Sequence, residues 1–202
     1  MSRPTPEQIH EARLEYAELG LRTLPLDDQK RPAVVDRKGD REVRYAWKRL
    51  EVDGDDDWAA SMSAAEPHPH AAGLGVVARD RLMVLDFDAK YYRPDADEPP
   101  DLFDAWWDQV LQLDAEFRAD AHYVVRTPSG GYHLYCRLAA GIEPAGIRAT
   151  PGGANPEFAQ NAEGQAIIES RWRSGYVAAP PTDGYEVLSG SPGGIREVDA
   201  DT

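Results

Sequence analysis

The most informative segment is Leu82-Met83-Val84-Leu85-Asp86-Phe87-Asp88, because it joins an apolar, β-forming run to two carboxylates. Side chains alternate along a strand, so Asp86 and Asp88 are expected on one face, about 7 Å apart along the backbone. Buried carboxylates need a cationic partner, and a divalent ion meets that need while it also binds phosphate oxygens. The pattern favours either a metal site or a strand that ends at Phe87 and leaves both aspartates in solvent.

The composition indicates one domain with a genuine core and no disulfide framework. The chain has 202 residues and a single cysteine, Cys136, so a cysteine-based zinc site is also excluded. Residues 1–25 show no cleavable signal pattern, and the apolar runs are shorter than the roughly 20 residues of a membrane span. We expect a soluble, intracellular, cytoplasmic protein with no membrane partner.

The charge is strongly negative and unevenly distributed. The formal net charge is -14, but residues 1–50 hold 11 Lys and Arg against 9 acids, whereas residues 51–120 hold 5 against 18. Phosphate contacts usually require a basic surface. A polyanion is therefore expected to approach by the N-terminal portion, by the arginines of the last third, or through bound metal ions, while most of the acidity serves solubility.

Hydrophobic periodicity predicts two helices and several short strands. The helices are expected at 6–20, with Thr5 as N-cap, and at 101–117; the strands are expected at 21–26, 73–78, 82–87, 123–127, 132–138, 166–171 and 175–179. Two hairpins are expected, one formed by 73–78 with 82–87 and one by 123–127 with 132–138.

The remaining segments are expected to be irregular. Residues 27–57 are predicted to be irregular with a short helix near the end, residues 139–164 to be a mobile loop, and the tail from residue 189 to be weakly ordered. Trp47, Trp58 and Trp172 are assigned to packing rather than to stacking on bases.

Three elements carry polar groups in a recognisable order: Asp86 and Asp88 at a strand end, Ser129-Gly130-Gly131-Tyr132-His133 in a hairpin, and Glu169-Ser170-Arg171 on a late strand. With these elements, the chain resembles the bifunctional DNA primase/polymerase (Prim-Pol) domain of the archaeo-eukaryotic primase superfamily over residues 15–188. The matching segments are 24–26 with 30–32, 73–77, 84–88, 126–135, and 168–171 followed by 175–181.

The resemblance implies an α+β fold with a mixed, largely antiparallel sheet in an RNA-recognition-like arrangement, flanked by the two helices. It implies one catalytic domain over residues 1–188, with a helical and basic portion at 1–65 and the metal and nucleotide site at 66–188, followed by the tail at 189–202.

The resemblance also implies a DNA primase/DNA polymerase, a nucleotidyltransferase that adds dNTPs or NTPs to a chain directed by a single-stranded or primed DNA template. Such chemistry uses two Mg²⁺ or Mn²⁺ ions about 4 Å apart, and no zinc. Asp86, Asp88 and Glu169 are the expected catalytic and metal-binding residues. The family commonly has Asp where Glu169 stands, so the metal spacing or preference here is expected to differ.

The expected nucleotide contacts come from the turn and from the strand after it. By resemblance, Ser129, Gly130, Gly131 and His133 bind the incoming nucleotide, through backbone N–H groups and an imidazole donor. Each residue type also has a plain structural interpretation, as a hairpin turn or a packed histidine. Arg171 either pairs with Glu169 or neutralises phosphate.

Basic residues near the N-terminus are a further expected contact. Lys30 and Arg31 are expected to contact template or nucleotide, or else to form a solvated charge pair.

Two motifs are absent from the sequence. No P-loop is found, so a helicase is expected from another chain or from a missing C-terminal portion, and the Cys/His insertion of some relatives is missing, which favours primer extension without initiation. The expected context is replication of a mobile element or phage in a prokaryotic cell.

Two other functions remain open on the residues alone. A haloacid dehalogenase-type phosphatase shares the hydrophobic-Asp-x-Asp pattern, but no lysine follows Lys90 and no acidic pair follows a later strand. A non-catalytic Prim-Pol-like protein that binds single-stranded nucleic acid or nucleotides is the stronger alternative, against which the acidic trio and His133 argue.

Overall fold

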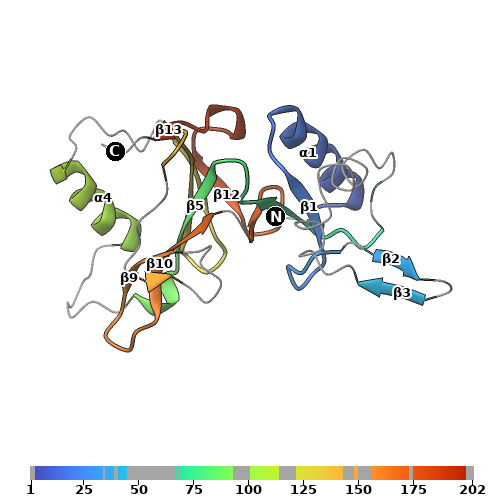
Figure 1. Ribbon diagram of the computed structural model, residues 1–202. Coiled ribbons are helices and arrows are strands. Elements are labelled where there is room, and N and C mark those ends of the chain that lie inside the picture. The colour runs from blue at the N-terminus through green and yellow to red at the C-terminus, as the bar shows by residue number, and fades with distance from the viewer. Residues whose placement is uncertain are drawn as a thin grey trace. The chain divides into compact units, whose positions relative to one another are not determined.

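The computed structural model describes residues 3–33, 35–38, 41–44, 67, 69–92, 101–113, 122–142, 148–149, 156–172 and 175–198. Over these residues the chain forms two larger, mainly antiparallel sheets, a separate two-stranded sheet and two α-helices, which confirms the predicted α+β class (Figure 1). The chain divides into two compact units. Unit 1 comprises Met1–Val77 and Tyr176–Tyr185, and unit 2 comprises Ala78–Gly175 and Glu186–Thr202.

Unit 1 contains the predicted N-terminal helix and a three-stranded antiparallel sheet in the order β1-β4-β11. Its elements are α1 (Pro6–Glu18), β1 (Thr23–Leu26), β4 (Gly73–Val77), β11 (Tyr176–Ala179) and a separate hairpin of β2 (Val35–Lys38) and β3 (Arg41–Arg44). Thr5 is the N-cap as predicted: its hydroxyl accepts from the Gln8 N–H, and the Gln8 side chain accepts from the Thr5 N–H, which satisfies two exposed donors of the first turn.

The hairpin predicted for residues 73–87 is wrong. β4 pairs with β1 and β11 in unit 1, whereas the next strand, β5 (Leu82–Phe87), pairs with other strands in unit 2. Both edges of β4 are occupied by strands distant in the chain, so no edge is left for β5. A local pattern marks a strand but does not say which strand it will pair with.

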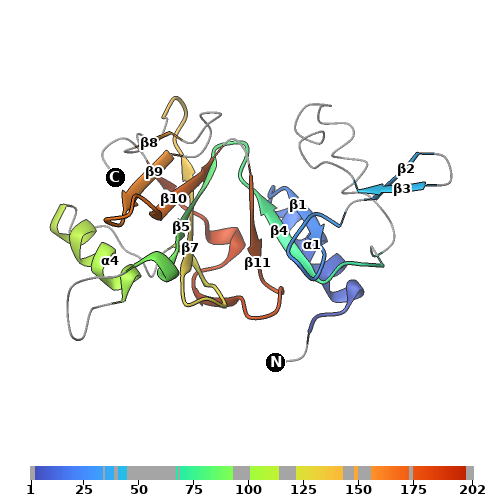
Figure 2. The same cartoon turned by 90° about the horizontal axis from the view of Figure 1, so that it is seen from below.

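Unit 2 is organised around an eight-stranded sheet in the order β12-β6-β7-β5-β10-β9-β8, with β13 parallel to β7. Its elements are β5, η1 (Ala89–Tyr91), α4 (Leu102–Leu113), β6 (Tyr123–Arg126), β7 (Tyr132–Leu138), β8 (Arg148–Ala149), β9 (Pro156–Gln160), β10 (Ala166–Trp172), β12 (Glu186–Ser189), η3 (Pro192–Gly194) and β13 (Glu197–Val198). The predicted β6–β7 hairpin is confirmed. β5 lies in the middle of this sheet, between β7 and β10 (Figure 2).

One face of this sheet is apolar and is covered by α4. Met83, Leu85 and Phe87 of β5 belong to a buried cluster with alternate residues of the neighbouring strands and with Leu102 of α4. The Phe87 ring lies edge-on to Trp106 at a centroid distance of 5.1 Å. Trp106 is partly buried and packs against this cluster, and Trp172 of β10 is buried within it, which confirms the assignment of Trp172 to packing.

Several predicted irregular segments contain regular structure. Residues 139–164 include β8 and β9, and β9 is held by pairing with β10, a contact that turn-forming composition alone does not reveal. Residues 27–57 include the β2–β3 hairpin. In the tail, Glu197 and Val198 pair with β7. The short helix expected near residue 57, Trp47, Trp58 and the expected end of the helix at residue 117 lie outside the described residues.

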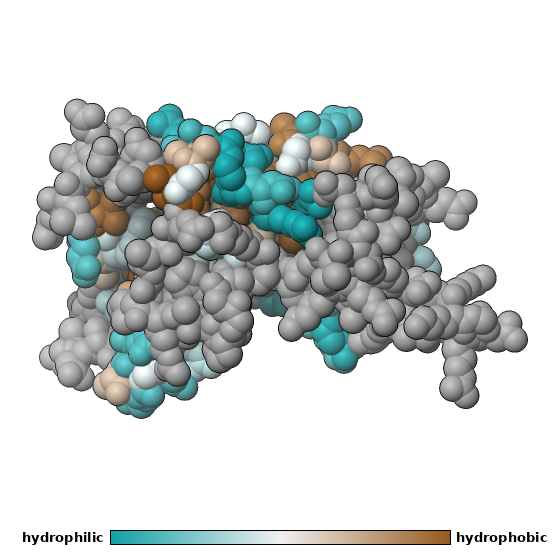
Figure 3. Space-filling view, viewed as in Figure 1, coloured by the Kyte–Doolittle hydropathy of each residue, from teal (hydrophilic) through white to brown (hydrophobic). Residues whose placement is uncertain are grey.

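The described surface mixes polar and apolar residues. In Figure 3, brown hydrophobic residues stand between teal hydrophilic ones on the face that is shown. Leu14 and Leu19 of α1 and Val187 and Leu188 of β12 are exposed. In the part of the chain that the structure describes, no helix is long and apolar enough to cross a membrane.

Candidate active site on the sheet of unit 2

Three predicted site residues lie in one row on the face of the unit 2 sheet opposite α4. This face is called the polar face here, because it carries Asp86, Glu169 and Arg171. Because side chains alternate along β5, Asp86 lies on the face opposite Leu85 and Phe87, which pack with α4. In the antiparallel register, Asp86 is directly opposite Glu169 of β10 on one side and His133 of β7 on the other. Residues that are far apart in the chain thus become cross-strand neighbours, whose Cβ atoms stand about 5 Å apart.

Arg171 joins the two carboxylates of this row. It stands two residues after Glu169, on the same face of β10, and its Nη2 donates to Glu169 Oε1. The same nitrogen lies 3.5 Å from Asp86 Oδ2. His133 Nε2 lies 3.6 Å from Asp86 Oδ1, which is longer than a direct hydrogen bond.

Burial sets the electrostatics of this row. The side chains of Asp86, Glu169 and Arg171 are 22%, 21% and 30% exposed. Burial raises the pKa of Asp86 above its usual value; Arg171 opposes that rise, and the negative charge of Asp88 adds to it. A carboxyl group in this state gains from any further positive charge placed beside it.

Asp88 lies just past the end of β5 and has a different partner. Its backbone N–H donates to the Ile167 carbonyl, which ties it to the start of β10, and its carboxylate forms an ion pair with Lys90 at 2.6 Å. The strand ends at Phe87, but neither aspartate lies fully in solvent, since the Asp88 side chain is 26% exposed. Among the described residues, no three His, Cys, Asp or Glu side chains stand close enough together to hold a metal ion.

The glycine turn meets β5 at the same end of the sheet. Gly130 has a φ of +79°, a conformation that a side chain disfavours, and a Cβ on Gly131 would collide with the Phe87 carbonyl oxygen. The Thr127 hydroxyl accepts from the Gly131 N–H and lies 3.1 Å from the Ser129 hydroxyl. The turn is therefore packed directly against the last residue before Asp88.

Lys30 and Arg31 belong to unit 1 and both have partners there. Lys30 donates to the Tyr185 hydroxyl at 3.0 Å, and Arg31 forms an ion pair with Asp27 at 2.9 Å. Both residues are exposed. A role in template or nucleotide contact stays a prediction.

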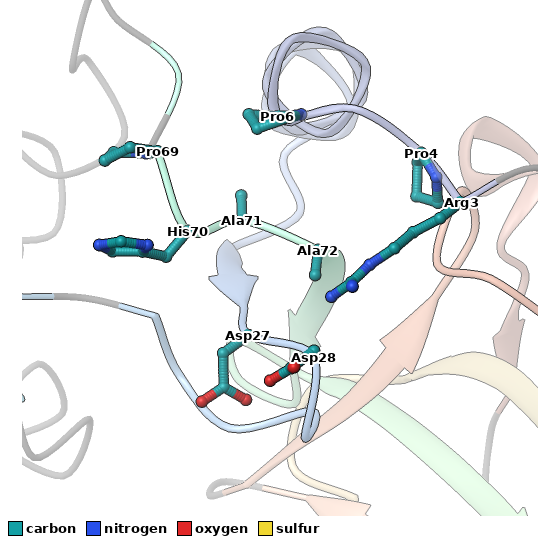
Figure 4. A pocket seen from close by; sticks show the side chains of 9 residues that line it. All are labelled: Arg3, Pro4, Pro6, Asp27, Asp28, Pro69, His70, Ala71 and Ala72. Atoms are coloured by element: carbon teal, nitrogen blue, oxygen red, sulfur yellow. The ribbon is translucent and has the colours of Figure 1, made fainter.

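Unit 1 also contains a cavity of about 470 Å³. Asp27, Asp28 and His70 line it, and the Arg3 side chain extends toward Asp28 in Figure 4. The cavity carries charges of both signs and includes none of the predicted site residues.

Two contributors to the site were not among the residues predicted from the sequence. Lys90 pairs with Asp88 two residues away, and Thr127 organises the turn through its hydroxyl. Thr127 was within reach of sequence reasoning, because a Thr four residues before a turn glycine can bond its N–H. Lys90 carried no such signal.

Some of the acidic residues at this site are suitable ligands for a divalent cation. Asp86 and Glu169 offer carboxylate oxygens, the ligands that Mg²⁺ prefers, and already share one cationic atom. Burial around Asp86 favours added positive charge. Asp88 could join them only by exchanging Lys90 for the ion.

The family model of bifunctional DNA primase/polymerase, N-terminal, matches residues 13–199, nearly the whole chain. The chain therefore belongs to this family, as its motifs predicted. Among curated proteins, no match to the chain is found.

Proposed function

We propose that this chain is a template-directed nucleotidyltransferase, a DNA primase or DNA polymerase that uses dNTPs or NTPs in replication. The family supports primase/polymerase-type activity. The observation that carries the proposal to particular residues is the cross-strand pairing of Asp86 with Glu169, which places two carboxylates next to each other on the polar face of the sheet.

In this proposal Asp86, Glu169 and Asp88 hold the divalent ions. When bound, such ions activate an attacking 3′-hydroxyl and neutralise the leaving pyrophosphate. The rigid sheet fixes the carboxylates, because Asp86 lies on a central strand paired on both sides. Asp88 lies where the strand gives way to η1, so it has more freedom to change partner.

The neighbouring elements are assigned to the nucleotide. The turn at Ser129, Gly130 and Gly131 lies close to the end of β5, because a Cβ on Gly131 would meet the Phe87 carbonyl oxygen. In this proposal the turn brings backbone near a phosphate group bound beside Asp88. His133 faces Asp86 and is 5% exposed, so its first task in this proposal is to orient that carboxylate; it donates to a phosphate oxygen when one lies beside Asp86. Arg171 supplies positive charge to the same place.

The test is incorporation of labelled dNTP and NTP on primed and unprimed single-stranded templates with Mg²⁺ or Mn²⁺. Asp86→Asn and Glu169→Gln are expected to abolish incorporation while the circular dichroism spectrum stays that of the wild type. Glu163→Gln is the matched control, because Glu163 is an exposed acid in the turn before β10. Undiminished incorporation by Asp86→Asn would refute the assigned role.

A non-catalytic nucleic acid or nucleotide binder is the second candidate. It is favoured by the closed state of the carboxylates, each of which has a basic side chain of the chain itself as partner. Binding of labelled single-stranded DNA or dNTP by the wild type, with no incorporation under any of the conditions above, would support it. Since the net charge is -14, template binding by the isolated chain should be weak and strongly dependent on salt.

A further inference from the structure

The three proposed metal ligands are already paired with basic side chains of the same unit. Arg171 contacts both Asp86 and Glu169 through a single nitrogen, and Lys90 contacts Asp88. Two of these acids, Asp86 and Glu169, are directly opposite each other on adjacent strands. Like charges in that position destabilise a sheet, so without bound metal the pair needs a cation between its members.

The geometry of β10 makes Arg171 the residue that fills this need. It lies two positions after Glu169, opposite Val84, and therefore on the same face as both carboxylates. A guanidinium is planar, permanently charged and rich in donors, so it can serve two carboxylates at once.

The Arg171 contact leaves hydrogen-bonding capacity unused. The Nε of Arg171 is buried and has no hydrogen-bond partner among the residues that the structure describes. A buried donor without a partner is unfavourable. The guanidinium would therefore gain by moving to a position in which its Nε donates a hydrogen bond.

We infer that Arg171 is a built-in counter-ion: it holds Asp86 and Glu169 together in the metal-free protein and is displaced when a divalent cation binds, which frees its guanidinium for phosphate oxygens. This inference rests on the proposed function, because it concerns the same carboxylates. A guanidinium and a divalent ion repel each other and compete for the same oxygens. Arg171 is thus a positioning residue that couples metal binding to triphosphate binding.

The coupling between Arg171 and the metal ion predicts in which direction Mn²⁺ affinity changes when Arg171 is replaced. Without Arg171, a divalent ion no longer displaces a competing charge, so Arg171→Gln should bind Mn²⁺ roughly tenfold more tightly than the wild type, within the usual range of coupling between sites. The same variant should lose most of the increase in affinity for inorganic triphosphate that Mn²⁺ produces in the wild type. Its midpoint of thermal unfolding without metal should fall.

The experiment measures Mn²⁺ binding by electron paramagnetic resonance, with and without inorganic triphosphate, for wild type, Arg171→Gln, Arg171→Lys and Asp86→Asn. Arg81→Gln is the matched control, because it also removes one positive charge and an ion pair in unit 2, but an exposed one with Glu197. Equal or weaker Mn²⁺ binding by Arg171→Gln, while Asp86→Asn loses it, would overturn the counter-ion role and leave the metal site intact. Mn²⁺ binding that Asp86→Asn does not change would overturn both.

A measurement on the wild type covers the case in which the variants do not fold. Phenylglyoxal modifies arginines that are not held in ion pairs, and peptide mapping reads each position. Mn²⁺ should accelerate modification of Arg171 several-fold and leave Arg81 unchanged, and added triphosphate should protect Arg171. Slower or unchanged modification of Arg171 with Mn²⁺ would overturn the inference.

Discussion

The two faces of the unit 2 sheet carry different tasks although they share the same strands. The face with Met83, Leu85 and Phe87 is covered by α4 and is apolar. The opposite face carries Val84 and Asp86 of the same strand, with Glu169 and His133 beside Asp86. Both faces bury apolar side chains, since Val84, Tyr123 and Tyr135 on the opposite face are also 0% exposed. The opposite face differs because it adds the charged row of Asp86, Glu169 and Arg171.

The site depends on core residues that are its immediate neighbours along the strand. Asp86 is flanked in β5 by Leu85 and Phe87, which are fixed by packing, so the backbone that carries the carboxylate cannot move without moving the core. Rigid support of this kind is what holds a binding group at a fixed position. Changes to the charged row should thus alter activity, and changes to the buried apolar residues should alter stability.

The largest effect is expected at Asp86. Asp86→Asn keeps the shape of the side chain but removes its charge, so incorporation of labelled dNTP should fall by roughly a thousandfold, the scale on which losing one electrostatic group lowers turnover. The free energy of unfolding, measured by urea titration, should change by less than about 1 kcal/mol, because burial already disfavours the charged carboxylate. A large loss of stability with activity retained would reverse the assignment of the two faces.

Phe87 is the corresponding test of the apolar face. Phe87→Ala removes a ring that is 1% exposed and contacts both Phe103 and Trp106, so the free energy of unfolding should fall by about 3–5 kcal/mol. Val187→Ala on β12 is the control, since Val187 is exposed and should change stability by less than about 0.5 kcal/mol. Similar losses for both variants would contradict the account of the core.

Gly131 tests the place where the turn meets β5. In Gly131→Ala the new Cβ would collide with the Phe87 carbonyl, and backbone cannot yield as a flexible side chain does, so a loss of about 2 kcal/mol in the free energy of unfolding is expected. Affinity for dNTP, measured by fluorescence titration, should fall as well. Gly194→Ala is the control, because a Cβ there meets only ordinary contact with Ser191. An unchanged Gly131→Ala protein would show that the turn is not held against the strand.

The smallest effect is expected at Cys136, whose ionisation makes the free energy of unfolding depend on pH. Burial raises the pKa of its thiol from 9.0 to about 12. Between these values the unfolded chain loses the proton and the folded chain keeps it, so the stability contributed at lower pH is lost as pH rises. By pH 10 the loss should reach about 1 kcal/mol.

The measurement for Cys136 is urea unfolding from pH 8 to pH 10, comparing wild type with Cys136→Val so that other titrating groups cancel. The difference between the two proteins should shift in favour of the variant as pH rises. A difference that does not depend on pH would mean that the thiol ionises equally in both states.

Much of the fold and part of the site could be predicted from the sequence. The capped helix after Thr5, the strands at residues 82–87 and 132–138, and the hairpin around Gly130 follow from patterns contained within a few neighbouring residues. The partner of β4 could not be predicted. Two adjacent β-forming runs, such as β4 and β5, can pair as a hairpin or can belong to two different sheets, as they do here. The same holds for β9, whose pairing with β10 spans a turn-rich segment.

Alternation and turn formation are local properties of the backbone. Neighbouring residues were therefore enough to predict Asp86 on an alternating strand, a glycine turn before His133 and a late strand with Glu169-Ser170-Arg171. The pairing of Glu169 opposite Asp86, the Arg171 contact with both and the ion pair of Lys90 with Asp88 became visible in the folded chain alone. The physical reason is distance along the chain: Arg171 and Asp86 are 85 residues apart, and their contact depends on the register of strands that the core selects.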